Sequence, residues 1–464
     1  MKILPVVLFG LSAVACTARI ENENLKPRIV VMTDIGPADV EPDDNESAVR
    51  LLAYADRFEI EAIITTVGWN CDPYPSDWAE YLSRVIDGYE TDVVNLMKRS
   101  EQTGFMNLED EQGKQQLGYW PSVDYVRSRM LMGSQSAGIG VIGEDNDTPG
   151  SRKIVELLDE DDDRPVWFLA WGSANTLSQA IWRVKQERND KEFRKILHKI
   201  RLYTITDQDM QYNMRMNREY SSHMWLRENF ADDLMLVWDE SAWLRQNANG
   251  VQDWESYVRY IQNHGEMGKV YPHYLWGVEG DTPSFLHVMP NGLNDPDDPT
   301  QVGWGGMHSF QMSPDGKTMA WTNWQQPLKS VSQSYEDSFY RDEFNDFAAR
   351  MAWAQDGRGN RNPIISINGD ESLKPVHMKA KAGECLFVNA SVHDPDGDEV
   401  SVKWWIQKSV DYIDEPVLVV AEGPSGCVYF DETMKGRTFH VICQANDDGD
   451  FNLPAYRRII VSVN

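Results

Sequence analysis

The residues most suited to chemistry are carboxylates that follow an apolar run near the start of the chain. Asp34 closes the run Arg28–Asp34 (RIVVMTD), and Asp43 and Asp44 stand shortly after it. Carboxylates gathered at one point repel each other unless a cation or shared protons neutralise them. Ca²⁺ is commonly bound by such clusters of oxygen ligands. The pattern predicts a divalent-cation site, although Asp43 or Asp44 serving only as a helix N-cap is the simpler alternative.

A parallel sheet is needed to bring these side chains together. Continuous apolar runs typical of buried parallel strands occur at Arg28–Asp34, Ile60–Gly68, Val166–Trp171 and Ile200–Thr206. Helical spacing alternates with them at Asp44–Asp56, Ser76–Gly88 and Thr176–Lys185. This alternation indicates an α/β fold with a mainly parallel, Rossmann-like sheet flanked by helices. In such folds the ligand site lies beyond the carboxyl ends of the strands, where Asp34 and Asn70 are predicted to meet.

The second half of the chain changes character twice. Residues 212–325 are predicted to form Trp-, Tyr- and Gly-rich loops with short helices, and a last amphipathic helix is predicted near Phe339–Ala354. After the linker-like stretch Gln355–Pro363, short alternating runs separated by Asp/Gly turns predict an Ig-like all-β sandwich. These runs are Cys385–Val392, Val400–Ile406, Val417–Ala421, Thr438–Gln444 and Arg458–Val463. We therefore expect an α/β domain over residues 27–360 and a sandwich over 363–464.

The amino-terminus has the features of an export signal. Residues 1–15 contain a short apolar run after Lys2, too short to span a bilayer, and Cys16 follows Ala13-Val14-Ala15. This resembles a lipobox, and an ordinary Ala-x-Ala cleavage site is the alternative. We expect an exported protein, either a cell-surface or periplasmic lipoprotein or a secreted one, that meets the membrane only through a lipid anchor.

The amino-acid composition limits the classes of molecule that the protein is expected to bind. The 464 residues carry 44 Lys and Arg against 73 Asp and Glu, a net charge of −29, which disfavours nucleic acid and anionic membranes. Of the four cysteines after Cys16, three lie near the carboxyl end, so one disulfide there is the most that we expect. The chain has no H-E-x-x-H, G-x-S-x-G or phosphate-loop motif, which argues against zinc, serine-nucleophile and nucleotide chemistry. No pattern predicts an oligomeric state.

Several motifs in order resemble a known family. Val31–Asp34 with Asp43–Ala48 (VMTD…DDNESA) and Ile63–Asn70 (IITTVGWN) look like the first two strands of nucleoside hydrolases. A closer resemblance is to secreted bacterial proteins, described as cellulose-binding, in which a nucleoside-hydrolase-like domain precedes a β-sandwich. The motifs that carry it are Glu41–Asp44 (EPDD), Trp171–Leu177 (WGSANTL), Thr206–Asp209 (TDQD), Glu279–Phe285 (EGDTPSF), Asn291–Asn294 (NGLN) and Gly303–Gly306 (GWGG).

The resemblance implies roles for individual residues. Asp34, Asp44 and Asp281 would ligate Ca²⁺, and Asp34 would also deprotonate a metal-bound water. Asp43 and Asn70 would hydrogen-bond sugar hydroxyls, and a backbone carbonyl near Asn175 could complete the site. The remaining candidates are Asp207 and Asp209 as catalytic acids, His308 as a further acid or substrate contact, and Trp304, in a Gly-rich turn, as a sugar-stacking ring.

The sequence differs from nucleoside hydrolases at several positions, so three functions are compatible with it. Met32 replaces an additional Asp, the gap from Asp34 to Asp43 is longer than in those enzymes, and Gly280-Asp281 stands for their late His-Asp pair. The favoured hypothesis is a Ca²⁺-dependent hydrolase of an N- or O-glycosidic bond in a carbohydrate. The alternatives are a non-catalytic protein that binds cellulose or a related glycan, and a purely structural surface protein.

Overall fold

The computed structural model describes residues 24–209, 221–408 and 417–464. The predicted signal peptide and Cys16 lie outside these residues. Within them, no helix combines the length and the apolar character that crossing a bilayer requires.

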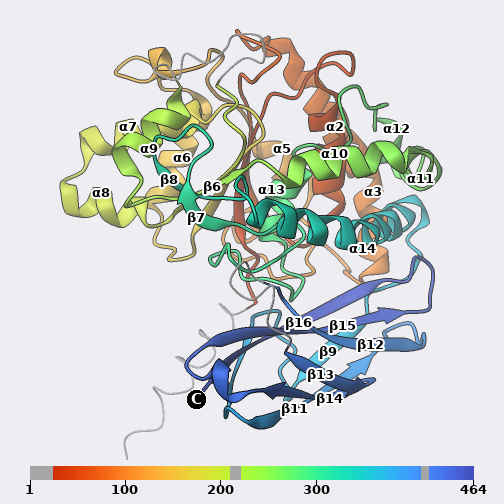
Figure 1. Cartoon of the computed structure of the whole chain (residues 1–464). Coiled ribbons are helices and arrows are strands. Elements are labelled where there is room, and N and C mark those ends of the chain that lie inside the picture. The colour runs from red at the N-terminus through yellow and green to blue at the C-terminus, as the bar shows by residue number, and fades with distance from the viewer. Residues whose placement is uncertain (1–23, 210–220, 409–416) are drawn as a thin grey trace, which may run out of the picture.

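An eight-stranded sheet forms the centre of the larger part of the molecule (Figure 1). Its strand order is β3-β2-β1-β4-β5-β6-β8-β7, and neighbouring strands are parallel except for the antiparallel pair β7 and β8. The strands are β1 (Arg28–Thr33), β2 (Glu59–Thr65), β3 (Met130–Met132), β4 (Val166–Ala170), β5 (Ile200–Ile205), β6 (Met235–Asp239), β7 (Ser309–Met312) and β8 (Met319–Thr322). The predicted mainly parallel α/β fold is confirmed.

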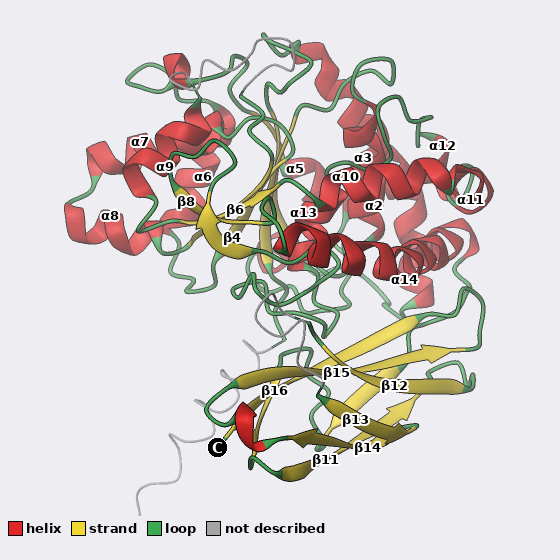
Figure 2. Cartoon of the chain, viewed as in Figure 1, coloured by secondary structure: helices red, strands yellow, loops and turns green. Residues whose placement is uncertain are grey.

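Helices cover both faces of this sheet, as Figure 2 shows. Alternate side chains of β1 enter different cores: Ile29 and Val31 pack with one set of helices, and Val30 and Met32 with the other. The first set contains α2 (Pro42–Ala53), α3 (Ala79–Arg99), α13 (Thr282–Val288) and α14 (Leu328–Asp356). The second contains α6 (Pro149–Asp159), α7 (Asn175–Glu187), α8 (Asp190–Leu197) and α9 (Ser222–Phe230). Burial on both faces explains why the strands are continuous apolar runs.

Shorter helices complete the α/β part. These are α4 (Leu108–Glu111), α5 (Val123–Ser128), α10 (Ala242–Gln252), α11 (Trp254–Tyr260) and α12 (Gly265–Lys269). Two helices are longer than their sequence patterns predict, because α3 extends to Arg99 and α14 begins at Leu328. The strands β6, β7 and β8 lie in or next to the stretch that we expected to consist of loops and short helices.

The carboxyl-terminal part is a sandwich of two four-stranded sheets, as predicted. One has the order β10-β16-β15-β12 and the other β13-β14-β11-β9. The strands are β9 (Ile364–Ile367), β10 (Val376–Ala380), β11 (Glu384–His393), β12 (Val400–Ile406), β13 (Leu418–Glu422), β14 (Ser425–Phe430), β15 (Thr438–Asp447) and β16 (Pro454–Val463). One disulfide, Cys385–Cys427, joins β11 to β14, while Cys71 and Cys443 are free and buried.

The sheet that contains β16 and β12 packs against the α/β part. The ring of Trp405 lies 6.1 Å from that of Phe339 in α14, and Tyr456 lies 6.1 Å from Trp304. A cavity of about 1300 Å³ between the two parts is lined by Lys26 and Pro165, which precede β1 and β4, and by Leu373 of the sandwich. The sandwich therefore adjoins the amino-terminal edge of the parallel sheet.

Arg458 of β16 is the main polar connection across this junction. Its buried guanidinium donates hydrogen bonds to the Val302 carbonyl at 2.9 Å, to Gln407 Oε1 at 2.7 Å and to the Leu293 carbonyl. These acceptors have little access to water, so each would lose its partner if the guanidinium were removed.

We expect Arg458→Ala to lower the free energy of unfolding by about 3 kcal/mol or more, because it leaves buried acceptors unpaired. Urea unfolding followed by fluorescence measures this loss. Lys435→Ala, at an exposed position of the same sandwich, is the control and should leave stability unchanged. Equal stability of the two variants would contradict the assignment.

Candidate metal centre at the carboxyl edge of the sheet

The chain segments that leave β1, β2 and β4 are tied together just beyond the strands. Thr66 donates its amide hydrogen to the Thr33 carbonyl at 2.8 Å, and Gly172 donates to Met32 at 2.8 Å. Ser173 donates to the Val67 carbonyl at 2.8 Å. Extended backbone therefore continues past the sheet and forms a fixed frame around Asp34.

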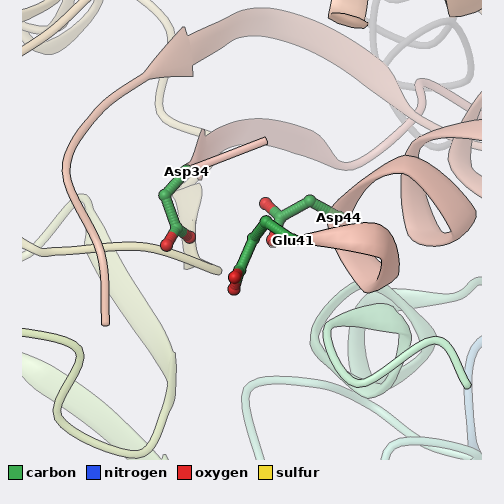
Figure 3. A group of neighbouring side chains, drawn as sticks. All are labelled: Asp34, Glu41 and Asp44. Atoms are coloured by element: carbon green, nitrogen blue, oxygen red, sulfur yellow. The ribbon is translucent and has the colours of Figure 1, made fainter. Parts of the chain in front are cut away.

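Five carboxylates gather inside this frame. Single oxygens of Asp34, Glu41 and Asp44 lie within 4.8 Å of one another, and so do oxygens of Asp43, Asp44 and Asp281. Figure 3 shows Asp34 leaving the end of its strand, with Glu41 and Asp44 coming from the beginning of α2. Because Asp44 belongs to both groups, the five form one continuous site, which we call the carboxylate cluster.

The start of α2 places three members of the cluster. Pro42 occupies the first helical turn, where its missing N–H leaves no hydrogen bond unmade, and Asp43 and Asp44 follow in the same turn. The Asn45 amide donates to the carbonyls of Gly36 at 2.8 Å and Glu41 at 3.0 Å, which closes the loop before the helix. Thr33 Oγ1 donates to Asp44.

Glu41 is a member of the cluster that our sequence analysis did not assign as a possible ligand. It lies in the segment that lengthens the loop between Asp34 and Asp43, and its side chain is buried. The signal was present, since a carboxylate directly before Pro42-Asp43-Asp44 starts the same helix. The sequence could not show where the Glu41 side chain points, because a residue before the first helical turn does not follow the periodicity of the helix.

Asp281 reaches the cluster from a separate loop at the start of α13. Glu279 has a φ of 58°, a left-handed conformation that needs external support in a non-glycine residue. That support is a buried ion pair with Arg50 at 2.6 Å and a hydrogen bond from the Tyr271 hydroxyl at 2.9 Å. Arg50 lies on α2, so one helix positions both Asp44 and the loop carrying Asp281.

Four oxygens of the cluster lack partners within the described part of the chain, whereas Asp44 accepts from Thr33 and Glu41 from Asn70. Both carboxylate oxygens of Asp34, Oδ1 of Asp43 and Oδ2 of Asp281 are buried without a hydrogen bond. Buried polar atoms in native proteins are normally satisfied, so these oxygens are suited to an added ligand. A set made only of oxygen donors fits a hard divalent cation rather than zinc.

Electrostatics support the same conclusion. Burial, reinforced by the charges of neighbouring carboxylates, raises the pKa values of Asp34, Glu41 and Asp281 well above their usual range. Burial raises the pKa of Asp43 to about 6, and burial together with the charge of Asp43 raises that of Asp44 to about 8. Without a cation, the ionised cluster is therefore destabilising at neutral pH.

The two candidate asparagines differ in their position. Asn70 is exposed beyond β2, and its amide donates to Glu41, so it adjoins the cluster. Asn175 is buried at the start of α7, where it donates to the Ser136 carbonyl and accepts from Thr66 Oγ1 at 3.3 Å. Asn175 thus fastens loops to each other.

Asp207 and Asp209 form a second, separate carboxylate pair beyond β5. Ser221 Oγ donates to Asp207 at 2.7 Å, and Asp209 accepts from Ser173 Oγ in the frame around Asp34. Burial and the charge of Asp209 raise the pKa of Asp207 to about 7. Trp69 Nε1 donates to the Asp207 carbonyl at 3.0 Å, which also connects this pair to the loop after β2.

Trp304 and His308 pack away from the cluster. Trp304 is only 4% exposed, and its ring meets Tyr456 of the sandwich. His308 is 1% exposed and packs 5.8 Å from the Tyr203 ring and 5.6 Å from that of His287. The sequence placed Trp304 in a Gly-rich turn, but that turn packs into the core.

Other aromatic residues lie at the rim of the cluster. Trp276 is 67% exposed and donates its Nε1 hydrogen to the Val40 carbonyl at 3.2 Å, in the loop that ends at Glu41. Trp69, next to Asn70, packs edge-on to Trp243 at 6.4 Å. The Trp-rich composition predicted aromatic contacts without indicating which rings would reach the site.

The parallel sheet with acidic residues gathered at its carboxyl edge is typical of a nucleoside-hydrolase-like protein. Residues 28–308, more than half of the chain, match the family described as "Cellulose-binding Sde182, nucleoside hydrolase-like domain". Residues 386–463 match "Cellulose-binding protein Sde0182, C-terminal domain". The chain belongs to this family of two-part proteins, which confirms the resemblance predicted from the sequence motifs.

A solved structure supports the fold. A nucleoside hydrolase-related hypothetical protein from Saccharophagus degradans, associated with carbohydrate metabolism, is 29% identical with a TM-score of 0.79, over 95% of this chain and 100% of that one. The effector protein XOO4466 is 10% identical with a TM-score of 0.35, over 75% of this chain and 100% of that one, too distant to support an inference. No curated protein matches.

A substitution at Gly68 tests the geometry of the carboxylate cluster. A Cβ atom there would lie 1.8 Å from Oδ2 of Asp34, so Gly68→Ala must displace that carboxylate. We expect about a 10- to 100-fold loss of divalent-cation affinity in calorimetry. Gly104→Ala is the matched control, because a Cβ at Gly104 meets nothing within 4 Å. Undiminished affinity in Gly68→Ala would rule out Asp34 as a ligand.

The raised pKa values predict a pH dependence. A carboxyl group whose pKa rises on folding stabilises the folded state below its unfolded pKa, and this contribution is lost as pH rises through the folded pKa. For Asp43 and Asp44 the shifts run from 3.8 to about 6 and about 8. In chelator, the melting temperature should therefore fall between about pH 4 and pH 8, less steeply in Asp44→Asn. A profile identical in wild type and variant would contradict this.

Proposed function

We propose that this protein is a Ca²⁺-dependent hydrolase of a glycosidic bond in a carbohydrate substrate. The observation that carries the proposal is the carboxylate cluster, in which four buried oxygens lack hydrogen-bond partners, at the edge of the sheet where ligands bind in α/β folds. Membership of a nucleoside-hydrolase-like, cellulose-binding family supports a carbohydrate as the partner.

The geometry of the cluster supports one set of ligands. Asp34, Asp44 and Asp281 would hold the cation, with Glu41 as a further ligand. A bound divalent cation would neutralise the cluster and acidify a ligated water molecule. Clusters rich in carboxylates and backbone carbonyls suit Ca²⁺, which accepts more oxygen ligands and a looser geometry than Mg²⁺.

Other roles in the proposed reaction, proton transfer and sugar binding, fall to individual side chains. Asp34, with both oxygens unpaired, would accept the proton of the attacking water. Asp43 and Asn70, at the margin of the cluster, would hydrogen-bond sugar hydroxyls. The exposed ring of Trp276 beside the Glu41 loop offers an apolar face for a sugar ring.

Asp207 is our candidate for the acid that protonates the leaving group. Its pKa of about 7 leaves a substantial protonated fraction near neutrality, as a general acid requires. Burial is the main cause of that raised pKa, and Asp209 beside it adds like-charge repulsion. In this proposal Asp34 acts as the base and Asp207 as the acid. Glycoside hydrolases commonly use two carboxyl groups in these two roles.

A non-catalytic carbohydrate-binding protein is the second candidate. The observation that favours it is the hydrogen bond between Asn70 and Glu41, which already engages a side chain that would otherwise contact substrate. In this case the cation would organise a sugar-binding surface, and Asp207 would have only a structural role.

Export through the amino-terminal segment, with a lipid attached to Cys16, remains part of the proposal. It is supported by the apolar run before Cys16 and by the Cys385–Cys427 disulfide, a bond that persists in oxidising compartments.

Calcium titration by calorimetry tests the metal site. We expect saturable binding by wild type that disappears in both Asp34→Asn and Asp44→Asn, because each removes a charged ligand. Asp39→Asn, an exposed residue of the same loop, is the control and should bind normally. Absence of binding by wild type would overturn the metal-dependent mechanism.

A screen of glycosides and nucleosides then separates the two candidate functions. The hydrolase predicts turnover by wild type and a loss of about 100-fold or more in Asp34→Asn. Saturable glycan binding without turnover would establish the binding protein instead.

A further inference from the structure

Four large, strongly exposed apolar side chains lie together on one face of the sandwich. Phe387 is 81% exposed, Val420 62%, Leu418 57% and Tyr429 37%. They come from three neighbouring strands, β11, β13 and β14. Exposed apolar groups are normal when scattered, but a contiguous patch on one face marks an interaction site.

The strand register makes this patch regular. Directly paired residues form two rows across β11, β14 and β13: Phe387, Cys427 and Val420 in one, and Cys385, Tyr429 and Leu418 in the other. The Cys385–Cys427 disulfide joins the two rows and braces the strands beneath them. We call these six residues the outer apolar face. Two aromatic rings on a braced sheet give a broad, stiff surface.

This face points away from the rest of the protein. The opposite sheet contacts the α/β part through Trp405, Tyr456 and Arg458, and the loop after β11 reaches it only from the end of the strand, through Asp396 and Arg99. In Figure 1 the strands β11, β13 and β14 lie on the far side of the sandwich from the α/β part. The outer apolar face is therefore separate from both the internal junction and the carboxylate cluster.

The chemistry of the face selects a neutral ligand with apolar surfaces. None of its six residues is charged, and the net charge of −29 disfavours polyanions and anionic membranes. Pyranose rings present flat C–H faces that pack on aromatic rings, and a polysaccharide chain repeats that face along its length. The family match over residues 386–463 covers every residue of the face except Cys385 and carries the description "cellulose-binding".

We propose that the outer apolar face docks a neutral polysaccharide of the cellulose type, with Phe387 and Tyr429 stacking on successive sugar rings. This inference deepens the carbohydrate role proposed above, but it does not depend on the carboxylate cluster. In this inference the sandwich holds the protein on the polysaccharide, and the α/β part carries out the proposed hydrolysis.

The test is a pelleting assay of the full chain with microcrystalline cellulose, repeated in solution with hydroxyethyl cellulose by affinity electrophoresis. We expect wild type to bind and the double variant Phe387→Ala, Tyr429→Ala to lose about tenfold or more in binding constant. Both side chains are exposed, and circular dichroism checks that the variant is folded.

The matched control is Phe310→Ala, which removes an aromatic ring that is 52% exposed on β7, outside the sandwich. It should bind cellulose like wild type, which excludes general hydrophobic adsorption. Asp34→Asn should also bind cellulose normally while losing calcium binding. That pattern separates this inference from the proposed active site.

Three results would overturn the inference: no binding by wild type, undiminished binding by the double variant, or equal loss in Phe310→Ala. Sedimentation velocity adds a fourth. If wild type dimerises, the double variant is monomeric and neither binds cellulose, the face is covered by a second copy of the chain. Calcium binding at the cluster would stand in each of these cases.

Discussion

The mutual repulsion of five clustered carboxylates, four of them buried, is the constraint on which the rest of the site depends. Desolvation and like charge both act against the ionised cluster, and the surrounding structure supplies no balancing cation among the described residues that contact it. The nearest compensation is indirect, because Arg50 pairs with Glu279 and not with the cluster itself. The fold holds the carboxylates in place through backbone hydrogen bonds at the strand ends and through helix α2.

This constraint explains the glycines around Asp34. Side chains at Gly68 or Gly172 would occupy space taken by the Asp34 carboxylate, with Cβ atoms 1.8 Å and 3.1 Å from its oxygens. Each glycine follows a different strand, β2 or β4. Close packing of three strand ends around one carboxylate thus requires the absence of side chains at both positions.

Much of this arrangement could be predicted from the sequence, because strand runs buried on both faces have an unambiguous apolar pattern. Asp34, Asp44 and Asp281 were placed near one another by the strand and helix order together with family resemblance. Glu41 was missed because it lies in a loop without periodicity. Trp304 was expected at the site because a Gly-rich turn suggests a surface loop, yet Tyr456 from a distant strand covers it. Contacts between the two parts of the chain leave no local signal in sequence.

The direction of the parallel strands has a mechanical consequence. The sandwich adjoins the amino-terminal edge of the sheet, and the carboxylate cluster lies at the opposite edge. Leu25 and Lys26, the first part of the chain described, also border the sandwich side. If the molecule were attached through its amino-terminus or its sandwich, the carboxylate cluster would therefore face away from the point of attachment. Tethering of this kind raises the effective concentration of polymer ends near the cluster without any new contact there.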